Sequence, residues 1–134
     1  MCNGYRQPRL LSRLLRELER DSNDIRIPRM LKGYFADIYH TPREIARVLR
    51  FGGHAGIVIG NVQYSGVCFP VDELTAQIGE NAGLRAERLA VARYRGNSAQ
   101  QMGVYGRNPA RETVVIFAKC PTAASDHRLD QFHG

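Results

Sequence analysis

A short apolar run close to the C-terminus, TVVIFAK at residues 113–119, constrains the fold of this 134-residue chain more than any other feature. It is rich in β-branched residues and continuously apolar at its centre, which is typical of a strand with neighbours on all sides. Two earlier segments also have the composition of strands, HAGIVIGN at 54–61 and AERLAVARYR at 86–95. The second has charged ends, which favours the edge of a sheet. The last strand in sequence is therefore predicted to be the more central one.

One strand order satisfies these preferences. The segment 71–83, VDELTAQIGENAG, has apolar residues at i, i+4 and i+8 and a glycine stop, so we expect it to form the crossover helix between the first two strands. The first strand, 54–61, is apolar on both faces, as expected of a buried parallel strand. If the first two strands form a right-handed parallel unit with a gap, the last strand can insert between them, antiparallel to both. The predicted fold class is α/β, with three strands and packing helices.

The N-terminal half is predicted to be helical. Residues 10–20, LLSRLLRELER, form an amphipathic pattern that we expect to pack on a sheet, and residues 29–39, RMLKGYFADIY, form a second, with Pro28 in its first turn. The TPRE motif at 41–44 predicts the start of a third helix, because its threonine can cap and its proline fits the first helical position. We expect that helix to end at the FGG motif, 51–53.

The glycines around this helix end invite comparison with a nucleotide-binding turn. A dinucleotide fingerprint runs strand, glycine turn, helix, whereas Gly52, Gly53 and Gly56 follow a predicted helix and precede a strand. They are interpreted as a helix stop and a strand entry. The segment VQYSGVCFP, 62–70, is interpreted as a loop.

Composition and charge limit the possible functions. No apolar run approaches the ~18 residues of a membrane span, and the N-terminus has no signal-peptide pattern, so we expect a cytoplasmic protein without a membrane partner. The three cysteines and four histidines form no ligand-spaced cluster, so no metal site is predicted. The net charge is +6, which favours an anionic partner. Arginine makes up 17 of the 19 basic residues, which either selection for phosphate and guanine contacts or a GC-rich genome would explain. Position therefore decides, and six arginines against one acid lie between residues 85 and 111.

Three stretches of the chain carry a resemblance to a known family. They are YFADIYHTPREIARVLRFGGHAGIVIGN, YSGVCFPVDELTAQIGENAG and RYRGNSAQQMGVYGRNPARETVVIFAK. Over about residues 29–120 this succession resembles the C-terminal half of a class I S-adenosylmethionine-dependent methyltransferase. More narrowly, it is similar to the DNA methyltransferases that modify an exocyclic amino group of adenine or cytosine.

This resemblance implies a partial Rossmann-like methyltransferase sheet over residues 1–120, and we expect a disordered tail at 121–134. Such enzymes hold S-adenosylmethionine with an N-terminal glycine loop and hold the target amine with a D/N/S-P-P-Y/F/W motif; neither occurs in this sequence. No catalytic or cofactor-binding residue is therefore assigned, and cofactor binding is expected to require the missing N-terminal half, which could lie on a second chain. Alone, the chain is expected to be inactive, with an exposed strand edge that promotes self-association.

A polar insert of unusual length, RYRGNSAQQMGVYGRNPARE at 93–112, separates the last two strands. A hairpin turns in about two to five residues, and ordered loops beyond about a dozen are uncommon unless they serve a function. Methyltransferases that act on duplex bases flip the target out and hold the strand, a task that suits arginines for phosphates, amides for base edges and a stacking ring. The predicted DNA contacts are Arg93, Arg95, Asn97, Gln100, Gln101, Tyr105, Arg107 and Arg111. The alternative is a solvated loop without a ligand.

Two further residues follow the first strand, where open α/β sheets place ligands. Asn61 and Tyr64 are predicted to line the target pocket, although asparagine is also a common turn residue. Arg111 and Glu112 are predicted to form an ion pair at the loop exit. The function predicted from the resemblance is site-specific DNA methylation within a restriction-modification system. The alternatives are an RNA base methyltransferase fragment and a non-catalytic nucleic-acid-binding remnant.

Overall fold

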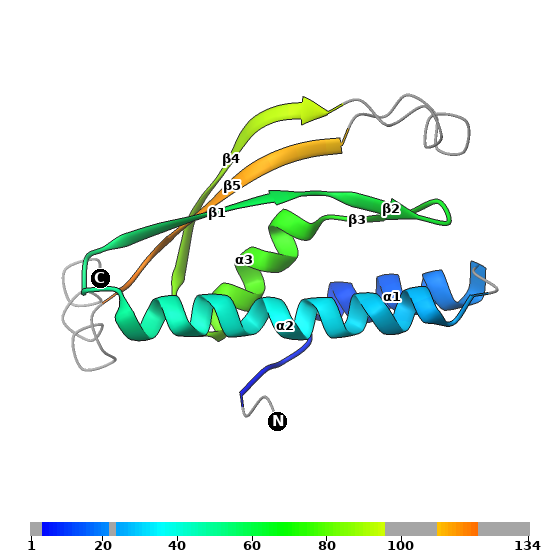
Figure 1. Cartoon of the computed structure of the whole chain (residues 1–134), viewed down its shortest axis with the longest axis horizontal. Coiled ribbons are helices and arrows are strands. Elements are labelled where there is room, and N and C mark those ends of the chain that lie inside the picture. The colour runs from blue at the N-terminus through cyan, green and yellow to red at the C-terminus, as the bar shows by residue number, and fades with distance from the viewer. Residues whose placement is uncertain (1–3, 22–23, 96–109, 121–134) are drawn as a thin grey trace, which may run out of the picture.

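The computed structural model describes residues 4–21, 24–95 and 110–120. Helices and a small hairpin lie on one side of a three-stranded sheet (Figure 1). The elements in chain order are α1 (Arg9–Asp21), α2 (Arg26–Val48), β1 (His54–Gly60), β2 (Val62–Tyr64), β3 (Val67–Phe69), α3 (Val71–Asn81), β4 (Arg85–Arg95) and β5 (Ala110–Ala118).

The larger sheet has the order β1-β5-β4, and β5 is antiparallel to both neighbours. In the register, Val114 of β5 lies opposite Val58 of β1 and Ala90 of β4. Since β1 and β4 both oppose β5, they run parallel to each other. The predicted α/β class and the predicted insertion of the last strand between the other two are therefore confirmed, as is the edge position of the strand at 86–95.

The prediction that the first strand is buried is wrong for the described part of the chain. There, β1 pairs with β5 alone, and its residues alternate between exposed and half-buried. Val58 is 67% exposed. The physical reason is that α3 covers one face of the sheet, so alternate side chains of β1 point into solvent.

One continuous helix replaces the two predicted between residues 29 and 50. Pro42 lies inside α2 instead of starting a new helix. A proline inside a helix removes one backbone hydrogen bond and costs about 3 kcal/mol. The buried residues Phe35, Tyr39 and Pro42 follow one another at helical spacing across the predicted break. Burial of this continuous stripe offsets the cost of the proline, and Pro28 does lie in the first turn of α2, as predicted.

The predicted loop at 62–70 is a β-hairpin. Tyr64 pairs with Val67, and the two residues between them, Ser65 and Gly66, have φ values of 49° and 78°. Positive φ at both central positions is the type I′ geometry, whose twist suits a two-residue hairpin. The hairpin buries Val67 and Phe69 in the larger hydrophobic cluster, to which α1 and α2 also contribute, and β3 contacts α1. The helix α1 therefore packs on this hairpin and on α2.

The helix α3 fits closely against the centre of the larger sheet. Gly79 faces the fully buried ring of Phe117, and a Cβ atom at Gly79 would lie 2.2 Å from Cε1 of that ring. The helix ends where the amide of Leu84 donates to the carbonyl of Gly79 (3.0 Å) and Gly83 adopts a φ of 105°. This Schellman-type end confirms Gly83 as the predicted helix stop.

The glycine-rich turn after α2 has the predicted role. Gly52 has a φ of 80°, and its amide donates to the carbonyl of Lys119 (2.9 Å), which leads the chain from α2 into β1 beside the end of β5. No helix among the described residues has the length and apolarity to cross a membrane. The predicted tail, 121–134, lies outside the described residues.

Candidate functional site

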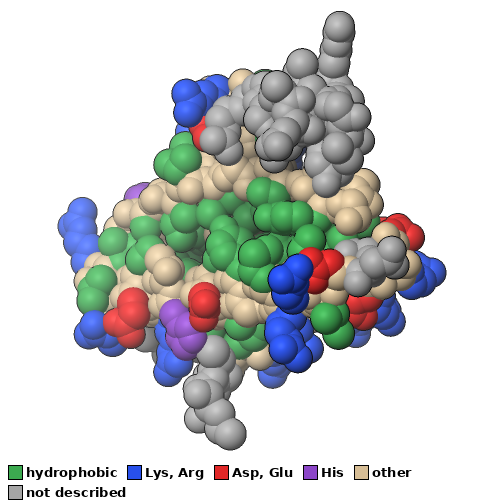
Figure 2. Space-filling model, turned by 45° about the vertical axis from the view of Figure 1, so that its right-hand side comes forward, with side chains coloured by type: hydrophobic (Ala, Val, Ile, Leu, Met, Phe, Trp, Pro, Cys, Tyr) green, Lys and Arg blue, Asp and Glu red, His purple; other side chains and the backbone are tan. Residues whose placement is uncertain are grey.

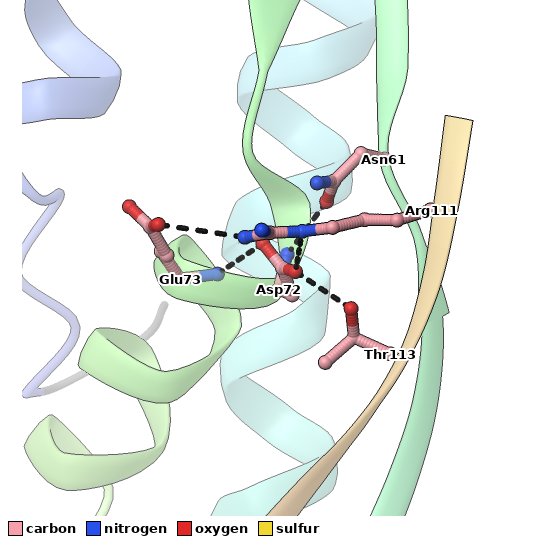
Figure 3. Close-up of polar contacts among 5 residues, drawn as sticks. All are labelled: Asn61, Asp72, Glu73, Arg111 and Thr113. Carbon is pink, nitrogen blue, oxygen red and sulfur yellow. Dashed lines mark hydrogen bonds and ion pairs between the residues drawn. The ribbon is translucent and has the colours of Figure 1, made fainter. Parts of the chain in front are cut away.

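A polar cluster lies where β1 ends, α3 begins and β5 starts (Figure 3). We call it the Asp72 cluster; its members are Asn61, Asp72, Glu73, Arg111 and Thr113. It occupies the carboxyl end of β1, the position at which ligands bind to open α/β sheets.

Asp72 is the buried centre of this cluster, with no exposed surface. Its Oδ2 atom accepts hydrogen bonds from Nε of Arg111 (2.8 Å) and from Oγ1 of Thr113 (2.7 Å), and its Oδ1 accepts one from the Glu73 amide (2.8 Å). Burial by itself would raise the pKa of Asp72, but the hydrogen bonds from Arg111, Thr113 and the Glu73 amide outweigh it, so the pKa is lowered. Asp72 is therefore an ionised, fully engaged carboxylate rather than a poised general base.

Asn61 caps α3 from outside the helix. Its Oδ1 accepts a hydrogen bond from the backbone N–H of Asp72 (3.1 Å), and the backbone N–H of Asn61 donates to the carbonyl of Arg111 (3.1 Å). The free amides at a helix start require such acceptors, and the positive end of the helix dipole favours the acids Asp72 and Glu73 in the first turn. Asn61 thus joins the end of β1 to the start of α3 through its side chain and to the start of β5 through its backbone.

Arg111 links the start of β5 to α3. Besides the contact with Asp72, its guanidinium lies 3.5 Å from Oε1 of Glu73, and about a third of the side chain is exposed. The hydrogen bond with Asp72 is the main reason that the pKa of Arg111 is raised. Its charge is therefore largely balanced inside the protein.

A second ion pair holds β4 to β5. Arg93 and Glu112 are opposite each other in the register, and their side chains form an ion pair. We expected an ion pair between Arg111 and Glu112, but the structure places each in an ion pair with a different element, because consecutive strand residues point to opposite faces. Two ion pairs therefore hold the described ends of the polar insert.

The remaining predicted residues are distributed as follows. Tyr64 is half-buried in β2 and packs against the larger core cluster. Burial, and to a smaller extent the nearby Tyr64, raises the pKa of Tyr34 in α2. Arg95 is the last residue of β4. The residues that lie outside the described part of the chain are Asn97, Gln100, Gln101, Tyr105 and Arg107.

The central residue of the cluster, Asp72, was not predicted from the sequence. Asp72 lies 39 positions from Arg111 and 41 from Thr113, so no local spacing connects them. The sequence signal that could have identified Asp72 is the acidic pair Asp72 and Glu73 in the first turn of a helix that follows a strand.

Among the described residues, no glycine turn leads from a strand into a helix in the way that the resemblance implies for an S-adenosylmethionine site. The start of α3 is occupied by Asn61 and by the Asp72 carboxylate, and the turn with Gly52 and Gly53 follows a helix and enters a strand. A donor site of the expected kind needs a glycine turn between a strand and a helix. In the described ranges, no three histidine, cysteine or acidic side chains are grouped as a metal would require.

The known proteins that this chain resembles in sequence are Type II methyltransferases. The chain is 40% identical over 112 residues to the Type II methyltransferase M.AvaI of a Nostoc strain, and equally to the M.AvaI of Anabaena variabilis. It is 36% identical over 91 residues to the Type II methyltransferase M.BsoBI of Geobacillus stearothermophilus. The M.AvaI match covers 82% of this chain but 23% of the relative, and the M.BsoBI match covers 67% and 18%. The chain thus spans less than a quarter of the length of these relatives, and no family model or solved structure matches it.

Proposed function

We propose that this chain, which is homologous to a segment of the Type II DNA methyltransferases, is the target-side part of such an enzyme. The complete enzyme would transfer a methyl group from S-adenosylmethionine to an exocyclic amine of a DNA base. The observation that carries this proposal is the 40% identity to M.AvaI over 112 residues, which include most of the fold described above.

The fold is consistent with a partial Rossmann-like methyltransferase sheet. Its last strand, β5, lies antiparallel between β1 and β4, as the resemblance to class I methyltransferases implies. The Asp72 cluster would then have a supporting role, since its carboxylate is buried and fully hydrogen-bonded. We propose that it fixes the start of β5, and with it one end of the polar insert, relative to α3.

The polar insert is proposed to contact DNA. The segment from residue 96 to 109 carries Arg107 and no acidic residue, and Arg95 immediately precedes it. Phosphate contacts from arginine supply affinity without sequence information, and side-chain amides such as those of Gln100 and Gln101 can contact base edges. Arg93 and Arg111 are proposed to contribute less to DNA binding, because each already has a carboxylate partner.

Binding of the methyl donor is proposed to depend on the rest of the enzyme, on the same polypeptide or on another. In the order of the described helices and strands, no strand leads through a glycine turn into a helix, which is the arrangement expected to hold the donor. S-adenosylmethionine would supply the methyl group, and this chain would position the DNA. By itself the chain is proposed not to methylate DNA.

A complementation assay tests this proposal. The chain is mixed with M.AvaI from which the matched segment has been deleted, and tritium transfer from labelled S-adenosylmethionine to DNA is measured. We expect transfer with the mixture and none with either component alone. Absence of transfer and of donor binding in the mixture would contradict the proposal, and preferential labelling of structured RNA over duplex DNA would favour an RNA methyltransferase instead.

A further inference from the structure

The exposed side of α1 carries a line of arginines. They recur at intervals of four, three and four residues, and all are exposed: Arg9, Arg13, Arg16 and Arg20. At about 100° per residue, this spacing places the four within a sector of about 60° around the helix axis. The leucines that the helix buries are centred on the opposite side: Leu11, Leu14, Leu15 and Leu18. We call the four arginines the α1 stripe, and it faces away from the core.

The charge of the α1 stripe is not balanced by pairing. Within the described part of the chain, none of the four arginines forms an ion pair. Glu17 lies four residues after Arg13 and Glu19 three after Arg16, at spacings that permit helix ion pairs, yet neither pairs with the stripe. Arginines in other elements do have carboxylate partners: Arg26, Arg47, Arg85, Arg93 and Arg111.

The stripe also works against the stability of its own helix. Each arginine lies three or four residues from the next, so that successive members are neighbours on the helix surface. Like charges at these spacings destabilise a helix. A row of like charges without internal partners does, however, concentrate ligands of opposite charge. Binding of a polyanion therefore accounts for an arrangement that folding does not require.

The dimensions and chemistry of the stripe fit a phosphate backbone. The helix rises about 1.5 Å per residue, so Arg9 and Arg20 are about 16 Å apart along the axis. One DNA strand rises about 3.4 Å per nucleotide, so this length corresponds to about five phosphates. The guanidinium group donates to phosphate oxygens through two parallel hydrogen bonds.

A lipid surface is a poorer partner for this helix. Amphipathic helices that lie on membranes insert their apolar face into the lipid. The apolar face of α1 is already used in the core, where Leu11 and Leu18 have no exposed surface. The helix therefore offers its charged side alone.

The position of α1 in the fold agrees with DNA binding. Along the longest axis of the molecule, α1 lies beneath the hairpin of β2 and β3, towards the end at which β4 finishes and β5 begins (Figure 1). It contacts β3 there. Figure 2 turns this end forward and shows Lys and Arg side chains projecting at the margins, outside a band of hydrophobic side chains. The described ends of the polar insert and α1 thus lie towards the same end of the protein.

We propose that the α1 stripe binds the phosphate backbone of duplex DNA as a second contact, separate from the polar insert; this inference rests on the proposed function, which supplies DNA as the polyanion. The contact is independent of base sequence, because phosphates carry no sequence information. It adds affinity and orients the duplex relative to the helices. The stripe precedes residue 29 and so lies outside the stretches that carry the resemblance to methyltransferases.

A pair of matched double variants tests this contact. Arg13→Gln with Arg16→Gln removes two neighbouring charges from the stripe, and the control, Arg43→Gln with Arg50→Gln, removes two exposed arginines around the C-terminal end of α2. Both changes lower the net charge equally, and glutamine has nearly the helix propensity of arginine. Binding of the chain to labelled duplex DNA is measured by fluorescence anisotropy at several salt concentrations.

The salt dependence gives the expected result. We expect the stripe variant to bind about tenfold or more weakly at moderate salt and its salt slope to fall by about 1.8 units, or about 0.9 for each lost phosphate contact. The control should change the slope little. Equal changes in the two variants, or an unchanged slope in the stripe variant, would overturn the proposal.

Chemical protection of the unaltered chain gives an independent test. Arginine side chains are modified with phenylglyoxal, with and without duplex DNA, and the modified peptides are measured by mass spectrometry. We expect DNA to slow modification of the α1 stripe severalfold and to leave Arg43 and Arg50 unchanged. Equal modification of the stripe with and without DNA would overturn the proposal. This result decides if circular dichroism shows that the stripe variant does not fold.

The outcomes separate this inference from the proposed function. Protection of the stripe by duplex DNA without methyl transfer in the complementation mixture would retain the contact and contradict the function. Methyl transfer with no effect of the stripe variant on DNA binding would retain the function and overturn the contact. Stronger protection by structured RNA, or protection by the truncated M.AvaI without DNA, would identify a different partner and also overturn the proposal.

Discussion

Replacement of Arg111 by methionine is expected to destabilise the fold through the buried carboxylate that it leaves behind. The change keeps most of the apolar stem of the side chain and removes the guanidinium that donates to Asp72 from 2.8 Å. Asp72 would retain the hydrogen bonds from Thr113 and the Glu73 amide, but it would have lost its nearest cation.

The size of the loss follows from the burial of the two partners. Breaking a fully buried pair by removal of one partner costs about 3–5 kcal/mol, whereas exposed pairs are worth about 1 kcal/mol or less. Asp72 is fully buried, but Arg111 is 33% exposed, so solvent screens part of the interaction. We therefore expect a loss of about 2 kcal/mol in the free energy of unfolding, or about 8 °C in Tm for a domain of this size.

The assay is urea unfolding of the chain followed by far-UV circular dichroism across a pH series. The pKa of Asp72 is lowered in the folded protein, so its ionised form stabilises the fold above the unfolded pKa of about 3.9, and this contribution is lost as the pH falls through the folded pKa. The difference between the wild type and Arg111→Met should thus be largest near neutral pH and shrink in acid. The control is Arg93→Met, which removes the ion pair with Glu112; the side chain of Arg93 is 68% exposed, so this pair is expected to contribute little. An equal loss in the two variants, or a difference that does not change with pH, would refute the reasoning.

Three further predictions concern packing and DNA binding. Gly79→Ala should destabilise the protein by about 1–3 kcal/mol, because its Cβ would lie 2.2 Å from a buried phenylalanine ring, whereas Gly33→Ala in open space on α2 should stabilise it by up to about 1 kcal/mol in the same thermal melt. Thr75→Val should raise the free energy of unfolding by about 1 kcal/mol, since the buried threonine hydroxyl has no hydrogen-bond partner within the described part of the chain; a lower Tm would contradict this. In the enzyme restored with M.AvaI, the double change Arg95→Gln and Arg107→Gln should weaken DNA binding at every sequence and lower the salt dependence by about one unit per lost phosphate contact, and an unchanged salt slope would exclude these contacts.

Local patterns predicted the parts of the fold that depend on neighbouring residues. Apolar periodicity identified α1 and α3, and Gly83 was correctly predicted to end α3. The contrast between the charged ends of β4 and the continuous apolar run of β5 was sufficient to predict their order in the sheet.

The errors arose where tertiary contacts override a local preference. Pro42 is a strong start signal, but the apolar stripe of α2 continues on both sides of it, and packing decides the outcome. Ser65 and Gly66 are a hairpin signal between VQY and VCF. Because the two strands are only three residues each, the segment was interpreted as a loop. The contacts of Asp72 join segments about 40 positions apart and have no local pattern.

The most direct test of the central claim is an exchange of segments within a relative. The 112 residues of M.AvaI that match this chain are replaced by the corresponding residues of this chain, and the rate of methyl transfer to DNA is compared with that of intact M.AvaI and of M.AvaI lacking the segment. If the chain is a functional target-side part of a DNA methyltransferase, the hybrid will transfer methyl groups to DNA, and the deleted enzyme will not. A hybrid that folds and binds S-adenosylmethionine but is as inactive as the deleted enzyme would contradict the account.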